Sequence, residues 1–337
     1  MNSTNITELV NTSKLTFNDL FANAENIQKD CFDYGVSNAG INSYLSEMGE
    51  YVFTDDFGVK HYMPLQPWGQ NCLCEKIGVP PAFLDKCYAH GFNELSADIV
   101  NSFLGEKTKT DFFVRSYQNR VRGILSKRYS PCDAPDILDG LLGDIIDEKE
   151  WNIKGHFFNE ERLHVRFVKE EPLNVDNEVL FPALVINSSD VGRCSLNVAF
   201  YIYRLACTNG LLVPEITSIR RQVHLGIKKD RFFEDVRHDM ANMKIMIANA
   251  EELINLARAK KVKMTTPEEI DALLAELHSK AKLDKDESKA VLQFLTDGKY
   301  EMTRWGLVNS ITEYARDQTL ETRLNLERSA GLLLKAA

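Results

Sequence analysis

Two long apolar runs decide the fold of this chain: NEVLFPALVIN at Asn177–Asn187 and RCSLNVAFYIYRLAC at Arg193–Cys207. Both are rich in β-branched and aromatic residues, which suit a pleated sheet, and the polar turn Ser188–Gly192 separates them. Asn-Gly at 209–210 follows the second run, and Leu211–Ile216 resumes the strand composition. Asn-Gly between apolar runs is a strong hairpin signal, because both residues tolerate the positive φ of a primed turn. The sequence therefore predicts a β-meander in which Arg193–Cys207 is the central strand, paired to the run on either side.

A second hairpin is expected upstream of the meander. Asp111–Tyr117 and Val121–Lys127 alternate between apolar and polar residues across Gln118–Arg120, and Leu163–Val168 adds another strand. Helical spacing governs most of the remaining chain, with segments at Phe17–Gln28, Pro67–Ile77, Pro81–Ala89, Asn93–Leu104, Ala134–Ile146, Phe232–Lys261, Ile270–Ala281, Asp286–Leu295, Thr303–Ala315 and Leu320–Leu334. The predicted fold class is α+β, an antiparallel sheet of hairpin plus meander with N-terminal helices and an α-helical C-terminal part.

These patterns divide the chain into three regions. Residues 1–105 form an N-terminal, mainly helical region, residues 106–229 form the α+β core, and residues 230–337 form the helical C-terminal region. Within the last region Trp305 shares a helix face with Val308, Ile311 and Ala315. We expect Trp305 to be buried against the α+β core and to tie the helical tail to the sheet.

Composition places the chain among ordinary globular proteins. Of its 337 residues, 44% are hydrophobic and 26% are charged, and no apolar run approaches the ~20 residues needed to span a bilayer. The segment Met1–Ile6 has neither the basic patch nor the apolar core of a signal peptide. The seven cysteines are odd in number and scattered, a pattern typical of reduced thiols. We expect a cytoplasmic protein with no membrane partner.

The charge is unevenly distributed along the chain. The formal net charge is −9, but Lys107–Arg128 and Arg220–Arg237 are locally basic. Local charge can outweigh total charge, because salt screens interactions beyond about 8–10 Å. Arg120 and Arg122 point to the same side in a regular strand, which suits contact with a phosphate backbone. The candidate nucleic-acid-binding residues are Arg115, Arg120, Arg122, Lys127, Arg128, Arg220 and Arg221, expected to form one electropositive groove; the alternative is two solvated strand faces.

Catalytic and metal-binding motifs are largely absent from the sequence. It has no Walker-type loop, no Gly-x-Gly-x-x-Gly after a strand, no His-Glu-x-x-His and no Gly-x-Ser-x-Gly. Cys72-x-Cys74 with Cys87-x-x-His90 offers four soft ligands, but a single residue separates the first pair, whereas zinc sites usually have two to four. His164 and Arg166 share a strand face, a pairing more often structural than catalytic. We therefore expect no catalytic residue, no metal and no cofactor.

Four short motifs carry a family resemblance. They are Arg128-Tyr129-Ser130, Asn187-Ser188-x-Asp190-x-Gly192, Arg204-x-x-Cys207-x-Asn209-Gly210-Leu211 and Trp305-Gly306-Leu307-x-Asn309-x-x-Thr312-Glu313-Tyr314. Together they resemble the phage/plasmid-like protein family catalogued as a domain of unknown function, over roughly Phe112–Gly331. In that family the turn before the long strand usually reads Ser-His-Asp, and Ser189 stands here in the middle position. Serine supplies neither a metal ligand nor an acid–base group at neutral pH, which weakens a chemical role for the turn.

The resemblance implies mobile-element biology, with the host cytoplasm as the expected location if the protein is phage-encoded. Its order of hairpin, helix and antiparallel sheet is similar in outline to the single-strand annealing proteins of phage recombination, an analogy at the level of fold. The leading hypothesis is a non-enzymatic protein that binds single-stranded DNA, as a homo-oligomer, in recombination or replication. One alternative is a protein-binding accessory or anti-defence factor with a phage or host protein as partner. The other is a metal-dependent hydrolase or nuclease with a site built from Asp190, His164 and distant acids.

Overall fold

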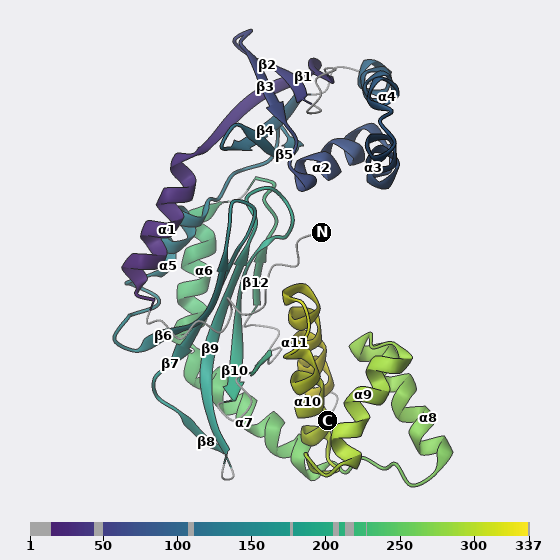
Figure 1. Ribbon diagram of the computed structural model, residues 1–337. Helices are drawn as coiled ribbons and strands as arrows, with labels where there is room; N and C mark the ends of the chain where they lie inside the picture. Colours follow the sequence, from purple (N-terminus) through teal and green to yellow (C-terminus); the bar gives the residue numbers. More distant parts are fainter. Residues whose placement is uncertain are drawn as a thin grey trace.

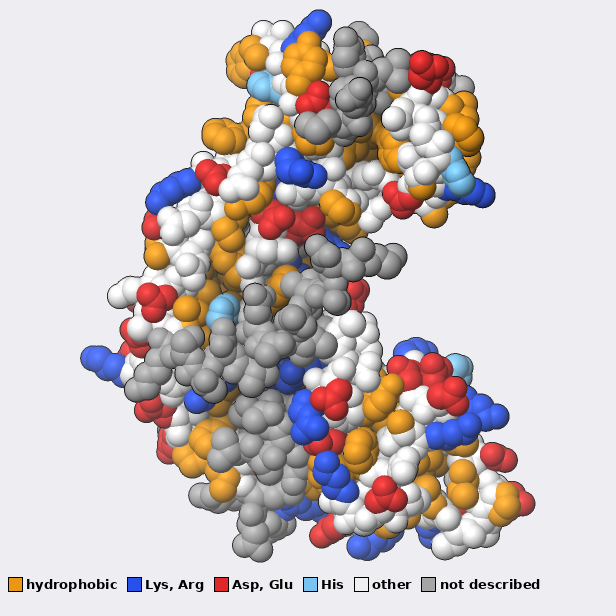
Figure 2. Space-filling model, in the orientation of Figure 1, with side chains coloured by type: hydrophobic (Ala, Val, Ile, Leu, Met, Phe, Trp, Pro, Cys, Tyr) orange, Lys and Arg blue, Asp and Glu red, His pale blue; other side chains and the backbone are white. Residues whose placement is uncertain are grey.

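The computed structural model describes residues 15–43, 50–106, 111–175, 178–204, 209–212, 219–226 and 228–335. It confirms the predicted α+β class, with two antiparallel sheets and many helices. Figure 1 shows a C-shaped molecule in which each sheet lies in its own lobe, and Figure 2 shows the surface hollowed between the two arms. We call residues 31–126 the barrel lobe, and the part that holds the second sheet the meander lobe.

The barrel lobe contains five strands, β1 (Cys31–Ser43), β2 (Glu50–Asp55), β3 (Lys60–Pro64), β4 (Asp111–Tyr117) and β5 (Arg120–Ser126). They pair antiparallel in the order β3-β2-β1-β4-β5. The two edges of this sheet then meet, because Leu65 and Val121 form a parallel bridge and the Gln66 N–H donates to the Val121 carbonyl at 2.8 Å. The sheet is therefore curled into a partly closed barrel.

Three helices are inserted between β3 and β4 of the barrel lobe. They are α2 (Pro67–Ile77), α3 (Pro81–Ala89) and α4 (Asn93–Glu106), and the first two begin with a proline where its missing N–H has no cost. Their apolar faces share one core with Val36, Phe53 and Val114 of the sheet. The helices were predicted, whereas β1–β3 were not. The sheet also crosses the boundary predicted between residues 105 and 106.

The meander lobe contains the second sheet, which confirms the predicted meander. Its strands are β6 (Trp151–Phe158), β7 (Leu163–Lys169), β8 (Leu173–Val175), β9 (Glu178–Ser188), β10 (Leu196–Arg204), β11 (Asn209–Leu212) and β12 (Ile219–Gln222). The order is β11-β10-β9-β7-β6; in addition, β12 pairs with β10 and β8 pairs with β9. As predicted, the central strand pairs with the run before it and with Leu211–Leu212 after it. The turn predicted at Asn209-Gly210 is wrong, because both residues lie in β11, opposite Arg204 and Tyr203. The expected continuations at 205–208 and 213–216 lie outside the described residues.

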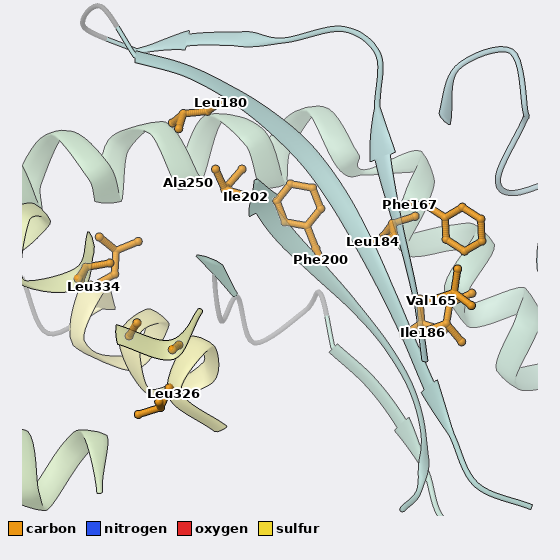
Figure 3. Packing of buried hydrophobic residues seen from close by; sticks show 14 of the residues in the cluster. Val165, Phe167, Leu180, Leu184, Ile186, Phe200, Ile202, Ala250, Leu326 and Leu334 are labelled. Carbon is orange, nitrogen blue, oxygen red and sulfur yellow. The ribbon is translucent and has the colours of Figure 1, made fainter. Parts of the chain in front are cut away.

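Helices cover this second sheet. On one side lie four helices, α1 (Phe17–Lys29), α5 (Ala134–Leu141), α6 (Lys229–Ala241) and α7 (Met243–Ala259) (Figure 1). The C-terminal helices follow in the chain: α8 (Pro267–Glu276), the π-helical turn η3 (Leu277–Ala281), α9 (Lys285–Thr296), α10 (Arg304–Ala315) and α11 (Leu320–Lys335). Figure 3 shows Ile202 of the sheet beside Ala250 of α7, with Leu334 of α11 belonging to the same core. Trp305 is also in this core and is 5% exposed, which confirms its predicted burial.

One predicted helix is divided in two. Phe232–Lys261 was expected to be continuous, but α6 ends and α7 begins around Asn242. The Asn242 side chain donates to the His238 carbonyl, and its N–H donates to the carbonyls of Asp239 and Met240. Asparagine competes with the helix ladder in this way and favours a turn.

Among the described residues, no helix is both long and apolar enough to cross a membrane.

Candidate functional site at the joint between the two sheets

Arg115 of β4 is the centre of a buried charge cluster between the two lobes. Its side chain is fully buried and makes five hydrogen bonds. Nε and Nη2 donate to the two carboxylate oxygens of Asp33 at 2.8 and 3.1 Å, and Nη1 and Nη2 donate to Asp133 at 2.8 and 3.2 Å. The fifth bond runs from Nη1 to the Asp190 carbonyl at 3.0 Å. Every N–H of this guanidinium therefore has an acceptor.

Burial and the neighbouring charges shift the pKa values of the residues in this cluster. Burial alone would lower the pKa of Arg115, but the carboxylates of Asp190, Asp133 and Asp33 raise it above its ordinary value. Burial pushes the pKa of Asp133 upward, and the contacts with Arg115, Asp190 and Arg122 together more than reverse this effect, so the net shift is downward. Burial raises the pKa of Asp190 despite its two arginine partners. Removal of one partner would leave buried charge without compensation.

Arg122 is the second arginine of the cluster, and a β-bulge places it there. Val121 opposes Ser116 and Gly123 opposes Arg115, so Arg122 is the extra residue of β5. Its side chain is 1% exposed, and Nη1 donates to both oxygens of Asp190, at 2.9 and 2.8 Å, and to the Glu160 carbonyl. Arg122 is buried against the meander lobe whereas Arg120 is exposed, so the two arginines do not share one solvent-facing surface.

The turn Ser188–Gly192 supplies the meander lobe's side of the joint. Trp68 of α2 donates from Nε1 to the Val191 carbonyl at 2.8 Å, and the guanidinium of Arg193 lies 5.0 Å from the Trp68 ring centre. Gly123 faces Val191 so closely that an added Cβ would lie 3.0 Å from the Val191 Cβ. The turn that carries the family motif therefore fastens the two sheets together.

Three stacked rings continue the joint. The rings of Phe113 and Tyr129 are 6.5 Å apart, and those of Tyr129 and His224 are 5.2 Å apart with an angle of 11°. The Tyr129 hydroxyl donates to the Ser189 carbonyl at 3.0 Å, and the Ser130 N–H donates to the His224 carbonyl at 2.7 Å. Burial lowers the pKa of His224 to about 4. His224 is therefore neutral at physiological pH.

The seven predicted nucleic-acid contacts do not form one exposed groove. Arg115 and Arg122 are buried in the cluster, and Arg220 is bound by Asp239, with Nη2 at 2.7 Å from Oδ1. Arg120, Lys127, Arg128 and Arg221 are exposed; Lys127 pairs with Asp111, and Arg221 donates to Ser195. The sequence prediction treated all seven of these residues as solvent-facing charges. Their carboxylate partners lie far away in the sequence, so no local signal marked the cluster.

Two other candidate sites came from the sequence: the cysteines with His90, and His164 with Asp190. Cys72, Cys74 and Cys87 are buried, whereas His90 is exposed at the end of α3, and no group of three potential metal ligands occurs within the described ranges. His164 is buried, and its Nδ1 lies 2.7 Å from Asn187 Oδ1, while Asp190 is held by arginines. The histidine and the carboxylate that were considered for a hydrolase are thus each held by other partners.

Comparison with known proteins identifies the family. The family described as "Domain of unknown function (DUF932)" matches residues 121–333, well over half of the chain. The chain belongs to the DUF932 family. No curated protein and no solved structure matches it. The match begins inside β5 and covers the meander lobe, so it includes Arg122, Asp133 and Asp190 but not Arg115 or Asp33.

Proposed function

We propose that this protein binds single-stranded DNA through the outer face of its barrel lobe, without catalysing a reaction on it. The main support for this proposal is the order in which the strands of the barrel are connected. β1 pairs with both β2 and β4, β5 pairs with β4, β3 meets β5 in parallel, and helices join β3 to β4. This is the connectivity of the OB barrel, a partly open five-stranded Greek key that binds oligonucleotides across strands 2 and 3 and the adjacent loops.

The side chains on that face have the required chemistry. Met63 points into the barrel core, so its neighbours Lys60 and Tyr62 on β3 point outward. Tyr62 is 50% exposed and Phe57, in the β2–β3 turn, is 92% exposed. The next turn, between β4 and β5, adds the exposed Arg120. Single-strand-binding barrels combine aromatic platforms for bases with cations for phosphates in this way.

The β4–β5 turn is fixed to this face. Gln118 and Asn119 both have positive φ, at 47° and 57°, which is the geometry of a tight hairpin turn. The Asn119 side chain donates to the Tyr62 carbonyl at 3.3 Å. Arg120 therefore follows directly after a residue bonded to the aromatic strand. A role in strand annealing as a homo-oligomer, within the host cytoplasm, belongs to the same proposal.

The test is fluorescence anisotropy with a labelled oligothymidylate and a matched duplex at two salt concentrations. Tyr62→Ala should weaken single-strand binding about 5- to 150-fold, because stacking on one aromatic contributes about 1–3 kcal/mol. Lys60→Ala with Arg120→Ala should reduce the log–log salt slope by about 0.7 for each lost phosphate contact. Phe92→Ala and Lys86→Ala, both exposed on the helical side of the lobe, are the matched controls. Absence of binding at low salt, or equal losses in the controls, would refute the proposal.

One observation favours a second candidate, the binding of a protein. Phe83, Phe92, Leu95 and Phe103 on or beside α3 and α4 are each at least 40% exposed. Figure 2 shows hydrophobic side chains between charged ones over this lobe. Exposed apolar groups that gather on one surface mark interaction sites. If Phe92→Ala removes a stable complex with a phage or host protein, and DNA binding is absent, this second function replaces the first.

A further inference from the structure

The hairpin of β2 and β3 exposes apolar side chains from its tip onward. Phe57 in the turn is 92% exposed, and Val59 and Tyr62 further along the same hairpin are 52% and 50% exposed. Figure 1 shows this hairpin at the end of the barrel lobe that lies away from the meander lobe. A covered aromatic side chain buries about 150–250 Å², so the open ring of Phe57 forgoes that stabilisation. Exposed apolar groups that gather in this way mark a contact surface.

Asp55 holds the turn in one shape. Its Oδ1 atom accepts the N–H groups of Phe57 and Val59, both at 2.9 Å. Its backbone carbonyl accepts the Gly58 N–H at 2.9 Å, and its own N–H donates to the Val59 carbonyl at 3.0 Å. Gly58 has a φ of 80°, in the left-handed region that favours glycine. The backbone that carries Phe57 is therefore fixed, although its ring is open to solvent.

The two neighbouring acids of this hairpin have different positions. Asp55 Oδ2 lies 2.9 Å from His61 Nε2, and the His61 ring lies against Tyr34 of β1 with 4.2 Å between the ring centres. The Asp56 N–H donates instead to the Gly35 carbonyl at 2.9 Å, and a Cβ added at Gly35 would clash with Asp56 Oδ2. The Asp55 carboxylate thus holds the turn and His61, whereas the Asp56 carboxylate lies over β1.

The surroundings of the tip suit a nucleic acid. Lys60 is exposed where β3 begins, and the exposed Arg120 follows Asn119, whose side chain donates to the Tyr62 carbonyl. The side chain of Asp55, the acid that organises the turn, is only 11% exposed. An open aromatic ring with cations nearby matches the faces of bases and the phosphates beside them.

From this arrangement we infer that Phe57 stacks on the last base pair at a junction between single-stranded and duplex DNA, with Asp55 as its positioning residue. Tyr62 lies on a strand of the hairpin, along which a single strand passes, whereas Phe57 lies at the tip and meets a duplex end-on. Apolar side chains presented in this way act as wedges at base steps. A fixed turn also loses less entropy on binding. The inference rests on the proposed single-strand binding and names the DNA structure that the site recognises.

The test compares an oligothymidylate with a forked duplex that carries the same single-stranded tail. Anisotropy gives the affinities, and 2-aminopurine at the junction reports stacking. We expect the wild type to bind the fork more tightly and to change the 2-aminopurine fluorescence. Phe57→Ala should abolish that change and weaken fork binding about 5- to 150-fold, the effect of one lost stacked base, with oligothymidylate affinity within about twofold of wild type. Tyr62→Ala should weaken binding to both DNAs.

The two acids provide a matched test of the positioning role. Asp55→Ala removes the acceptor of the two turn N–H groups and should lose the fork preference as Phe57→Ala does. Asp56→Ala removes the same charge one residue away and should keep the preference. Asp55→Asn keeps an oxygen that accepts both N–H groups and should restore the preference. A role of charge alone would make the two alanine variants alike and would leave Asp55→Asn unrestored.

Each result decides the inference. It is overturned if the wild type binds fork and oligothymidylate equally, if Phe57→Ala weakens both DNAs alike, or if the two alanine variants at the acids behave alike. Retention of the fork preference in Phe57→Ala, together with loss of a protein partner, overturns it as well. If Asp55→Ala does not fold, the exposed Phe57 still decides. Single-strand binding without a fork preference sinks the inference alone, whereas absence of any binding by the wild type also sinks the proposed function.

Discussion

Arg115 of β4 donates a hydrogen bond from Nη1 to the backbone carbonyl of Asp190, which lies 75 residues further along the chain. The same guanidinium also holds Asp33 of β1 and Asp133 at the start of α5. One buried side chain therefore connects the barrel, the helix that follows it and the turn of the meander. Arg115 therefore helps to fix the relative position of the two sheets.

Replacement of Arg115 by alanine should destabilise the protein by about 3–5 kcal/mol, because it leaves buried carboxylates without their partner. Urea denaturation followed by circular dichroism measures this change. Lys127→Ala is the matched control: its pair with Asp111 lies on the same hairpin but is exposed, and such pairs contribute about 0–1 kcal/mol. A loss for Arg115→Ala no larger than that for Lys127→Ala would contradict the structural role of the cluster.

The pH dependence of stability should report on His224. Burial lowers its pKa to about 4 in the folded protein, whereas an unfolded histidine titrates near 6.5. The unfolded state therefore binds more protons between these values, so stability is complete above about pH 6.5 and falls as the pH drops toward 4. The contribution at stake is roughly 3 kcal/mol. His224→Gln should flatten this part of the stability curve, and a slope unchanged from wild type would exclude His224 as the cause.

The meander and the β4–β5 hairpin could be predicted because their signals are local. Apolar runs bounded by a turn lie next to one another in sequence, and their pairing follows from that proximity. The strand β1 gives no such signal. It reads CFDYGVSNAGINS, with two glycines, two asparagines and two serines, and one of its partners, β4, lies about 80 residues away. Long-range pairing of a polar strand determines the barrel, and periodicity does not detect it.

The candidate site failed to appear in the sequence for a different reason. The basic segments are real, but whether an arginine faces solvent or a carboxylate depends on residues brought together only by folding. Arg115 meets Asp33, 82 residues away, and Arg122 is buried against Asp190 of the meander turn while Arg120 remains exposed. Charge runs therefore predicted which strands matter, without predicting which side chains are free to bind.

Trp305→Ala should lower the free energy of unfolding by about 3–5 kcal/mol, as is typical for loss of a buried aromatic. Trp305 packs in the core of the meander lobe, and the guanidinium of Arg258 on α7 lies 5.8 Å from its ring. Differential scanning calorimetry gives the change in Tm. Leu256→Ala, an exposed position on the same helix as Arg258, should leave Tm almost unchanged. If both variants melt like wild type, α10 does not secure the helical tail.

Closure of the barrel can be tested at Gly69. An alanine Cβ at this position of α2 would lie 2.4 Å from the backbone oxygen of Val121, the atom that accepts the Gln66 N–H where the two sheet edges meet. Since backbone cannot rotate away, α2 must shift, and such overpacking costs about 1–3 kcal/mol. Gly105→Ala in α4 meets open space and should be neutral or stabilise by up to about 1 kcal/mol. Hydrogen exchange gives the local readout: the Gln66 amide should lose protection in Gly69→Ala and keep it in Gly105→Ala. Unchanged protection in both variants would mean that the bridge between Leu65 and Val121 does not hold the barrel closed.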